Sequence, residues 1–234
     1  MKLLAIDSSG LTATVAVLED EKLLAEYTVN YKKTHSQTLV PMLEDIRSMT
    51  ELDLGSIDAI AVAKGPGSFT GLRIGSATAK GLGLALSKPV IPVSTLDALA
   101  MNVWGSDKLV CPIMDARREQ VYTGLYRFDN GELVTVKEAC AISVEELKDI
   151  LNEMGDEVLF LGDGVPVYRD KLDETLTVAH GYAPAHMSRQ RAGALAVLAG
   201  KYYKEGRVET AAEHKPEYLR LSQAERERLR AHSG

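Results

Sequence analysis

The residues with the clearest chemical potential lie in a glycine-rich stretch, Lys64-Gly-Pro-Gly-Ser-Phe-Thr-Gly-Leu-Arg-Ile-Gly75. It follows an apolar run at 57–63 that predicts a buried strand, and it opens a proline-free segment at 69–86 that favours a helix. In a strand–turn–helix unit, the backbone N–H groups at the helix start can bind an anion such as phosphate. The stretch matches neither the dinucleotide G-x-G-x-x-G pattern nor the Gly-Lys-Ser/Thr ending of a P-loop. Its spacing leaves two interpretations open, an anion site or a tight turn between strand and helix.

Histidine and cysteine, the usual ligands of transition metals, are scattered along the chain. The histidines are His35, His180, His186, His214 and His232. They form no H-x-x-x-H or H-E-x-x-H pattern. Cys111 and Cys140 lack the C-x-x-C spacing and lie among apolar residues, which predicts reduced side chains and neither a disulfide nor a metal pair. Ser68 is not part of a G-x-S-x-G elbow. We therefore expect no stoichiometric zinc or iron, and no other cofactor.

The elements that would position these residues fall into two similar halves. The first half opens with three strands whose alternating pattern predicts an antiparallel meander, at residues 2–6, 12–18 and 22–29. Ser36 is a suitable N-cap for a helix that bears an apolar stripe at helical spacing. That helix and the remaining elements are predicted at residues 36–49 (helix), 57–63 (strand), 69–86 (helix), 90–93 (strand) and 94–99 (a capped helix).

The pattern then restarts in the second half. Residues 108–115 repeat the apolar strand ending in aspartate that residues 2–7 form. The elements that follow are an alternating strand at 120–127, a hairpin turn at 129–131, a strand at 132–136, a helix from a capping box at 143–146 to about 153, a strand at 158–162, a long helix at 188–205 and a charged tail from Pro216. We therefore predict a duplicated α/β fold with subdomains 1–104 and 105–234, the second containing the long helix and the tail.

This layout resembles that of the actin/hexokinase/Hsp70 (ASKHA) superfamily, whose two halves enclose a nucleotide cleft. In that superfamily an aspartate at the end of the first strand of each half faces the phosphates and the metal. The resemblance assigns a vestigial nucleotide cleft to Asp7, Ser8, Ser9, Asp115 and Arg117. The second of these loops fits poorly, because it lacks the glycine and hydroxyl residues that let backbone wrap a phosphate. Arg117 and Arg118 could contact an anion, or simply be solvated.

Composition limits the partners of this chain. The 234 residues carry a formal net charge of −6 at pH 7, and the sequence pI is near 5.5. An acidic chain does not by itself attract nucleic acid, so in a reaction on RNA a partner would supply most of the basic surface. No apolar run is long enough to span a membrane, and the apolar run that ends in Asp7 is too short for a secretory signal. We expect a soluble, cytoplasmic protein without a membrane partner.

Three longer sequence motifs indicate which family this chain resembles. Residues 65–75 (GPGSFTGLRIG) closely resemble the signature of the bacterial TsaB family, also called YeaZ-like, a non-catalytic relative of the TsaD/Kae family. Asp115-Ala-Arg-Arg-Glu-Gln-Val-Tyr122 and Pro216-Glu-Tyr-Leu-Arg220 support the resemblance further along the chain. The resemblance implies an accessory subunit that docks on TsaD and supports it. Together with a TsaE-like ATPase, that complex forms threonylcarbamoyladenosine next to the anticodon of tRNAs that read ANN codons.

The resemblance also implies that the chain lacks a catalytic centre. TsaD carries two histidines in a segment that corresponds here to residues 93–99. Thr95 and Leu99 stand where those imidazoles would be required, so the metal ligands are absent. The metallopeptidase-like site of the relative is therefore not carried over, and we assign no catalytic residue.

The helix at 69–86 bears a stripe of small residues. Gly71, Gly75, Ala79 and Gly83 recur every four residues, although each helical glycine costs roughly 0.8–1 kcal/mol relative to alanine. Close approach of another backbone within the same domain is the favoured reason. The TsaB resemblance implies that this helix and the helix at 36–49 also form the surface that binds TsaD, or a second copy when the chain is alone. The residues assigned to that surface are Leu39, Val40, Leu43, Arg73, Ser76, Ala77, Lys80 and Leu84.

Two other functions stay open. A stand-alone small-molecule kinase or phosphatase of the same fold would bind ATP and use Asp7 and Asp115. A peptidase is disfavoured by the missing metal ligands. A scaffold and activating subunit is the leading hypothesis, and titration of the isolated chain with Mg-ATP separates it from the kinase alternative.

Overall fold

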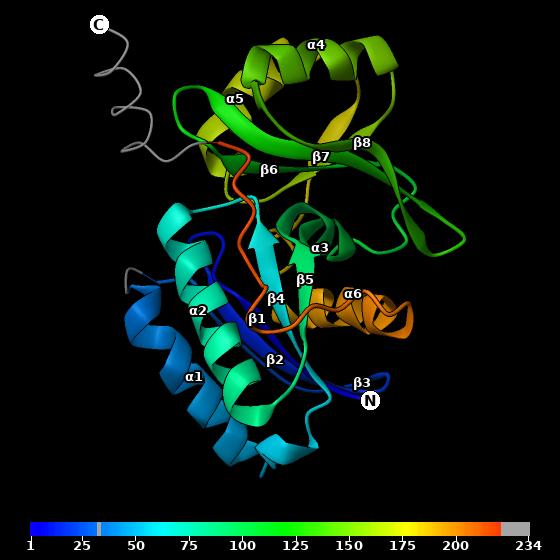
Figure 1. Cartoon of the computed structure of the whole chain (residues 1–234). Helices are drawn as coiled ribbons and strands as arrows, with labels where there is room; N and C mark the ends of the chain where they lie inside the picture. The colour runs from blue at the N-terminus through cyan, green and yellow to red at the C-terminus, as the bar shows by residue number, and fades with distance from the viewer. Residues whose placement is uncertain (32–33, 221–234) are drawn as a thin grey trace, which may run out of the picture.

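The computed structural model describes residues 1–31 and 34–220, which form two five-stranded mixed sheets (Figure 1). The first sheet has the order β3-β2-β1-β4-β5, and the second has the order β10-β9-β6-β7-β8. In each half, three antiparallel strands precede a helix, a parallel strand, a second helix and another parallel strand. The two halves therefore have the same connectivity. The prediction of a duplicated α/β fold is confirmed.

The first sheet is covered on both faces. Its strands are β1 (Lys2–Asp7), β2 (Ala13–Glu19), β3 (Lys22–Val29), β4 (Ala59–Gly65) and β5 (Val90–Ser94). Helices α1 (His35–Met49) and α2 (Phe69–Leu86) cover one face, and α6 (Ala192–Lys204) covers the other (Figure 1). A short 3-10 helix, η1 (Leu54–Ser56), leads into β4.

The alternation of side chains in β1 explains why this strand is apolar throughout. Leu4 and Ile6 pack in the cluster that contains the buried residues of α1, whereas Leu3 and Ala5 pack in the cluster that contains α6. A strand that is buried on both faces needs apolar residues at every position. The continuous apolar runs of β1 and β4 follow from this double coverage.

The second sheet is covered in the same way. Its strands are β6 (Leu109–Asp115), β7 (Gln120–Asp129), β8 (Glu132–Ser143), β9 (Val158–Leu161) and β10 (His180–Tyr182). Helices α4 (Val144–Met154) and α5 (Val165–Thr175) pack on one face through Leu147, Leu151 and Leu172. The other face is covered by α3 (Thr95–Met101), which packs through Leu96 and Leu99.

The last helix of each half packs on the sheet of the other half. We predicted the helix at 188–205 and the tail as parts of the second subdomain, but α6 lies on the first sheet through Leu195, Ala196 and Ala199. The reason is that both faces of the second sheet are already covered, whereas small residues such as Ala5 and Ala16 leave room for α6 on the first. The chain from residue 205 onward then returns to α2.

Several predicted bounds differ from those of the structure. The second helix, Phe69–Leu86, is as predicted, but α6 is shorter and β8 continues to Ser143. Helix α5 and strand β10 were not predicted, because α5 is mostly polar with a proline in its first turn and β10 has three residues. The tail beyond residue 220 lies outside the described residues. Within the described residues, no helix is both long enough and apolar enough to cross a membrane.

Candidate functional site

The glycine-rich turn packs against the loop that follows β1. The Ser68 side chain caps α2 by accepting a hydrogen bond from Gly71 N at 3.3 Å, and Ser68 N donates to the Ser9 carbonyl oxygen at 2.6 Å. A Cβ added at Gly67 would lie 2.3 Å from that same carbonyl oxygen, and one added at Gly71 would lie 2.0 Å from the Ser8 carbonyl oxygen. The glycines therefore allow two backbone segments to touch. Of the two interpretations of this stretch, the geometry supports the tight turn.

Asp7, Ser8 and Ser9 are brought together with this turn, and all three are buried. Ser9 donates to the Asp7 carboxylate through its backbone N–H at 2.8 Å and its hydroxyl at 2.6 Å. Ser8 Oγ donates to the Gly71 carbonyl oxygen at 2.9 Å. Burial raises the pKa of Asp7 to about 6, although the hydrogen bonds from Ser9 lower it. The loop that would wrap a phosphate in a nucleotide cleft is thus filled by the chain itself.

The second candidate aspartate is likewise occupied by its own neighbours. Asp115 Oδ1 accepts hydrogen bonds from Tyr168 OH at 2.9 Å and from Arg117 N at 2.8 Å. Its backbone N–H donates to Asp163 Oδ1 at 3.2 Å, and burial raises the pKa of Asp163. Asp163 also raises the pKa of Asp7 electrostatically, so it lies near both loops. Asp163 is not among the residues predicted from the sequence, although the flanking pair Gly162 and Gly164 marks the turn that presents it.

The turn between β6 and β7 is strained. Arg117, Arg118 and Glu119 have φ values of 64°, 57° and 55°, a left-handed conformation that costs roughly 1–2 kcal/mol for each residue other than glycine. Arg117 Nη1 lies 3.3 Å from Asp115 Oδ2, and an exposed ion pair of this kind contributes only about 0–1 kcal/mol. The side-chain ion pair of Arg117 therefore does not by itself offset the strain of the turn.

Asp7→Asn is expected to raise the free energy of unfolding at pH 8 by about 2–3 kcal/mol, at about 1.4 kcal/mol per pKa unit. The folded-state pKa of about 6 lies above that of an unfolded aspartate, about 3.9. The native state therefore holds the extra proton between these values, and its stability falls as the pH rises from about 4 to about 6. Asparagine keeps an acceptor for Ser9 and carries no charge. The measurement is urea unfolding of both proteins at pH 4, 6 and 8. If the free energies of unfolding of the two proteins changed with pH in parallel, the Asp7 carboxyl would not be the cause of the pH dependence.

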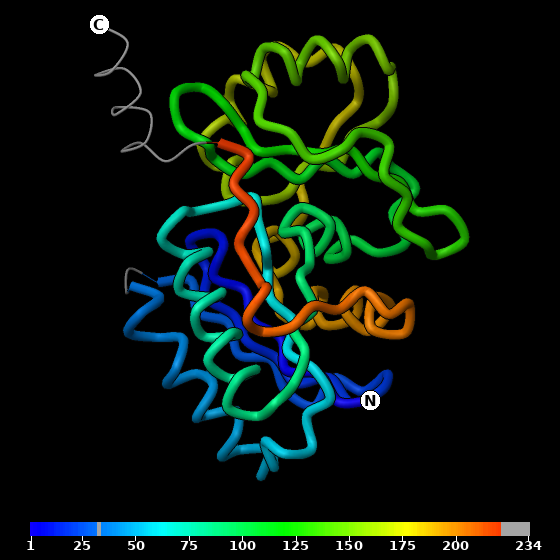
Figure 2. Tube along the Cα trace, in the orientation of Figure 1, coloured from blue at the N-terminus to red at the C-terminus, as the bar shows by residue number. Residues whose placement is uncertain are grey.

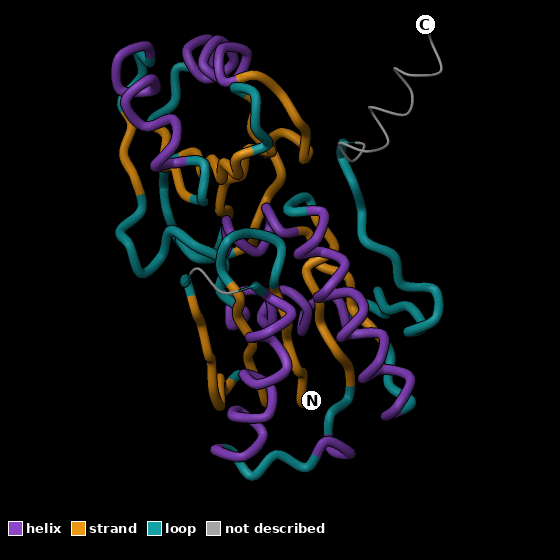
Figure 3. The backbone as a smooth tube through the Cα atoms, turned by 90° about the vertical axis from the view of Figure 1, so that its left-hand side faces the viewer, coloured by secondary structure: helices purple, strands orange, loops and turns teal. Residues whose placement is uncertain are grey.

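Helices α1 and α2 lie next to each other and present one side of the molecule (Figure 3). Val40 and Leu84 are 61% and 62% exposed, and Arg73 and Ala77 are also exposed. Leu43 and Lys80 are half-buried. These residues, drawn from both helices, are the part of the predicted partner surface that the structure leaves accessible.

Two residues that we assigned to the partner surface are interior residues. Leu39 is 1% exposed and packs with Met42 and Ile46 against the first sheet, and Ser76 is 5% exposed. The helical repeat turns these positions away from Val40 and Ala77, which immediately follow them in sequence. Lys80 is also engaged within the chain, because its Nζ donates to the carbonyl oxygens of residues 212 and 214 at 3.0 Å each.

Residues 205–220, which we call the C-terminal arm, connect the two halves. Figure 2 shows this arm leaving α6, running beside α2 and ending at the second sheet. Glu217 pairs with Lys64 through a backbone hydrogen bond and a side-chain ion pair, both at 2.6 Å. The Tyr218 ring lies 4.7 Å from that of Phe69, and Arg220 donates to the Ala116 carbonyl oxygen at 2.5 Å. The arm thus links β4 and α2 to the strained turn.

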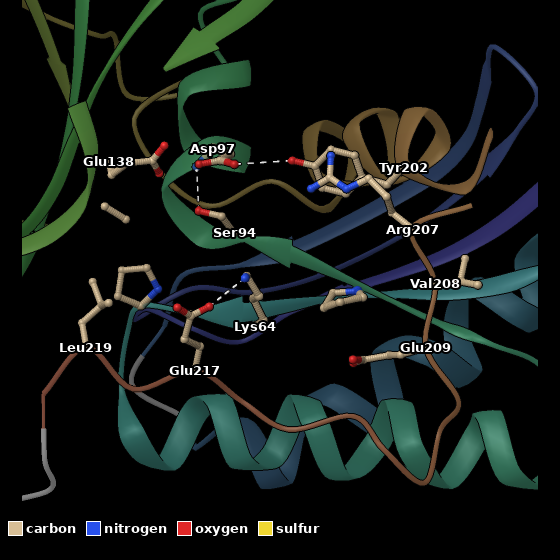
Figure 4. A pocket seen from close by; sticks show the side chains of 14 residues that line it. Lys64, Ser94, Asp97, Glu138, Tyr202, Arg207, Val208, Glu209, Glu217 and Leu219 are labelled. Atoms are coloured by element: carbon tan, nitrogen blue, oxygen red, sulfur yellow. Dashed lines mark hydrogen bonds and ion pairs between the residues drawn. The ribbon is translucent and has the colours of Figure 1, made fainter. Parts of the chain in front are cut away.

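A cavity of about 490 Å³ lies between the arm and the edge formed by β4 and β5 (Figure 4). Its charged lining residues are Lys64, Asp97, Glu138, Arg207, Glu209 and Glu217. Lys64 is paired with Glu217, and Arg207 lies over the Tyr202 ring, 3.5 Å from its centroid. Asp97 accepts hydrogen bonds from the hydroxyls of Tyr126 and Tyr202 at 2.9 and 3.4 Å. Because most of these charges are paired within the chain, the cavity does not resemble a catalytic site.

The positions that the family resemblance compares with metal ligands are buried in α3. Thr95 and Leu99 are both interior residues. Across residues 1–31 and 34–220, no group of three or more His, Cys, Asp or Glu side chains is arranged to hold a metal ion. Cys111 is buried and Cys140 is half-buried, and both are free thiols.

A family model and two relatives that are similar to this chain in sequence all point to the same family. The sequence model of the family described as "TsaD: tRNA N6-adenosine threonylcarbamoyltransferase" matches residues 22–228. The chain is 37% identical over 225 residues to the "tRNA threonylcarbamoyladenosine biosynthesis protein TsaB" of Bacillus subtilis, covering 96% of each chain. It is 30% identical to the protein of the same name in Escherichia coli, covering 94% of this chain and 95% of the other.

A solved structure has the same fold over nearly its whole length. "YeaZ from Pseudomonas aeruginosa" superposes with a TM-score of 0.77 at 29% sequence identity, covering 93% of this chain and 99% of the other. A second structure from that organism, described as "an uncharacterized protein with similarity to peptidase YEAZ", gives a TM-score of 0.78 at 29% identity, with 94% and 99% covered. The similarity extends through both halves and α6.

Proposed function

Because the chain belongs to the TsaB/YeaZ family, and so has a role in tRNA threonylcarbamoyladenosine biosynthesis, we propose that it acts as a non-catalytic subunit that binds and supports a TsaD homologue. The observation that carries this proposal is the side formed by α1 and α2, where large apolar side chains remain exposed. Val40 lies on one helix and Leu84 on the other. Burying such side chains against a partner contributes about 1.5–3 kcal/mol each.

The shape of α2 favours a helix of the partner as the contacting element. Its exposed positions Arg73, Ala77, Gly81 and Leu84 recur at helical spacing. A Cβ added at Gly81 would meet no atom within 4 Å, so this glycine is not required by the monomer. Small residues on an exposed helix face allow a second helix to approach closely. The proposed partner surface therefore consists of Val40, Leu43, Arg73, Ala77, Gly81 and Leu84.

A second copy of the chain would use the same surface when the TsaD homologue is absent. A two-fold interface brings the same patch of both copies together, so a patch occupied by its own copy cannot bind another partner. Homodimer and heterodimer are therefore mutually exclusive in this proposal. The TsaE-like ATPase and the tRNA join through the TsaD homologue, in the cytoplasm.

The alternative of a stand-alone kinase or phosphatase requires an accessible Asp7. In this chain the Asp7 loop is buried and hydrogen bonded to the glycine-rich turn, and Asp115 is occupied by Tyr168 and Arg117. A nucleotide would have to displace these contacts. We therefore assign no catalytic residue to the chain, and we assign no peptidase activity to it.

Reconstitution with the TsaD homologue of the same organism tests the proposed function. We expect a 1:1 complex by size-exclusion chromatography, and tRNA threonylcarbamoylation, measured by nucleoside mass spectrometry, that depends on this chain. Isothermal titration of the chain alone with Mg-ATP is expected to show no tight binding. Tight binding with turnover that Asp7→Asn abolishes would reject the scaffold role in favour of the kinase alternative.

A further inference from the structure

Four arginines lie where the C-terminal arm meets both halves of the molecule, and the function proposed above leaves three of them unexplained. Arg117 and Arg118 stand on the strained turn after β6, and Arg220 donates to the Ala116 carbonyl oxygen within that turn. Arg73 reaches the arm from α2 through a hydrogen bond from its Nε to Tyr218 OH at 3.4 Å. We call Arg73, Arg117, Arg118 and Arg220 the arginine edge.

Backbone hydrogen bonds hold the strained turn in place at both of its ends. Ala116 N donates to the Gln120 carbonyl oxygen at 2.9 Å, and Val144 N donates to the Glu119 carbonyl oxygen at 3.0 Å. Glycine would adopt the left-handed conformation at positions 117 and 118 with no side-chain penalty. Strained residues cluster at functional sites, where the surrounding structure holds them in place. The presence of arginine in place of glycine at both positions therefore points to a role for the exposed side chains.

The positive charge of the arginine edge is only partly neutralised by nearby carboxylates. Glu217 is paired with Lys64 at 2.6 Å, and Glu119 lies 3.7 Å from Lys171. In the part of the chain that the structure describes, Arg118 has no hydrogen bond or ion pair, and both it and Arg117 are exposed. Asp115 is the one carboxylate there that pairs with an arginine of the edge. On a chain of net charge −6, this edge is a local positive region.

Aromatic side chains accompany the guanidinium groups. The Arg73 guanidinium lies 3.9 Å from the centroid of the Phe69 ring, and that ring packs on Tyr218. Phe69 is half-buried and Tyr218 is exposed. Guanidinium groups bind phosphate oxygens in bidentate geometry, and an exposed aromatic ring next to them suits nucleotides better than an acidic protein surface. The edge also adjoins the proposed partner surface, since Arg73 belongs to both.

We propose that the arginine edge contacts the phosphodiester backbone of RNA, which on the proposed function is the tRNA held by the complex with the TsaD homologue. A partner would still supply most of the basic surface that binds the RNA. The chain would contribute a small number of phosphate contacts. Their contribution to affinity would be strongly dependent on salt concentration.

The test compares tRNA binding by complexes that contain the wild-type chain or the double variant Arg117→Gly/Arg118→Gly. Filter binding over a series of KCl concentrations measures the affinity and its salt dependence. We expect the variant chain to keep or raise its melting temperature, because glycine relieves the strain, and to form the complex normally. Its tRNA affinity is expected to fall about tenfold, and the slope of log affinity against log salt to become shallower by about one to two.

Two further variants make the result specific. Arg117→Lys/Arg118→Lys keeps the charges and is expected to retain an intermediate affinity, since lysine cannot bind phosphate in bidentate geometry. Arg169→Gln removes an exposed arginine of α5 and is the matched control, with affinity and salt slope expected to match the wild type. An unchanged affinity and slope in the glycine variant would overturn the proposal. The proposal would also be overturned if the glycine variant no longer bound the TsaD homologue but bound RNA as well as the wild type does. The arginine edge would then contact the partner protein and not RNA.

The wild-type complex separates this inference from the proposed function. If the wild-type chain does not bind the TsaD homologue, the proposed function fails. The same titration is also run at low salt with the chain alone, where the comparison of wild type with the glycine variant still decides whether the arginine edge binds RNA.

Discussion

Gly71→Ala is expected to reduce the free energy of unfolding by about 3 kcal/mol or more, because overpacking against rigid backbone is among the costliest single substitutions. The added Cβ would lie 2.0 Å from the Ser8 carbonyl oxygen. That oxygen belongs to the loop that carries Asp7, so it cannot move aside as a flexible side chain would. The change also places alanine in a helix, which by itself would be favourable by about 1 kcal/mol. Urea and thermal unfolding of the purified variant measure the net effect.

Gly81→Ala is the matched control for this result. It makes the same chemical change in the same helix, but nothing lies within 4 Å of the added Cβ. We expect it to stabilise the protein by about 0.5–1 kcal/mol. If both variants shifted stability by the same amount and in the same direction, close backbone packing would not be the reason for Gly71.

Leucine at the other two glycines of the buried stripe is expected to destabilise the protein as well. At Gly75 the nearest atom to an added Cβ is Ser8 Oγ at 2.6 Å, and at Gly83 it is the Cβ of Ala211 at 2.7 Å. Ala211 belongs to the C-terminal arm, so Gly83→Leu would also displace the arm from α2. Unchanged melting temperatures in both variants would show that this face of the helix is not closely packed.

Val40→Glu and Ala77→Glu are each expected to weaken binding of the TsaD homologue by about 100-fold or more, with little change in melting temperature. A charge that is buried without a partner at the centre of an interface costs several kcal/mol, and about 2.7 kcal/mol corresponds to a 100-fold change in affinity. Both positions are exposed in the monomer, so the variants should fold. Size-exclusion chromatography, alone and with the TsaD homologue, and a tRNA modification assay are the measurements.

Val167→Glu is the matched control for the partner surface. Val167 is a 55% exposed valine on α5, which packs on the second sheet away from α1 and α2. We expect this variant to bind the TsaD homologue and to form homodimers normally. Leu39→Glu is unsuitable as a test, because Leu39 is a core residue and its substitution would unfold the protein.

The outcomes also decide whether one surface serves both assemblies. If Val40→Glu and Ala77→Glu stay folded and lose the homodimer, yet bind the TsaD homologue and support modification normally, the two surfaces differ. If neither assembly changes, the side formed by α1 and α2 is not the interface.

Features that depend on local patterns could be predicted from the amino-acid sequence. The glycine-rich stretch and the bounds of α2 follow from turn residues and helical periodicity within about twenty residues. The duplication follows from the repeated strand that ends at Asp7 and again at Asp115. Residues 65–75 indicated the family, because a motif of this length is specific.

Contacts between distant segments of the chain could be seen only in the folded molecule. Helical spacing could not show which side of α1 faces the sheet, so Leu39 was assigned to the surface although it is a core residue. The position of α6 was decided by which sheet face was still uncovered, and the arm reached Ala116 through a contact between residues 104 positions apart. Such contacts depend on the complementary shape and charge of surfaces that form only when the chain has folded, and no local pattern encodes them.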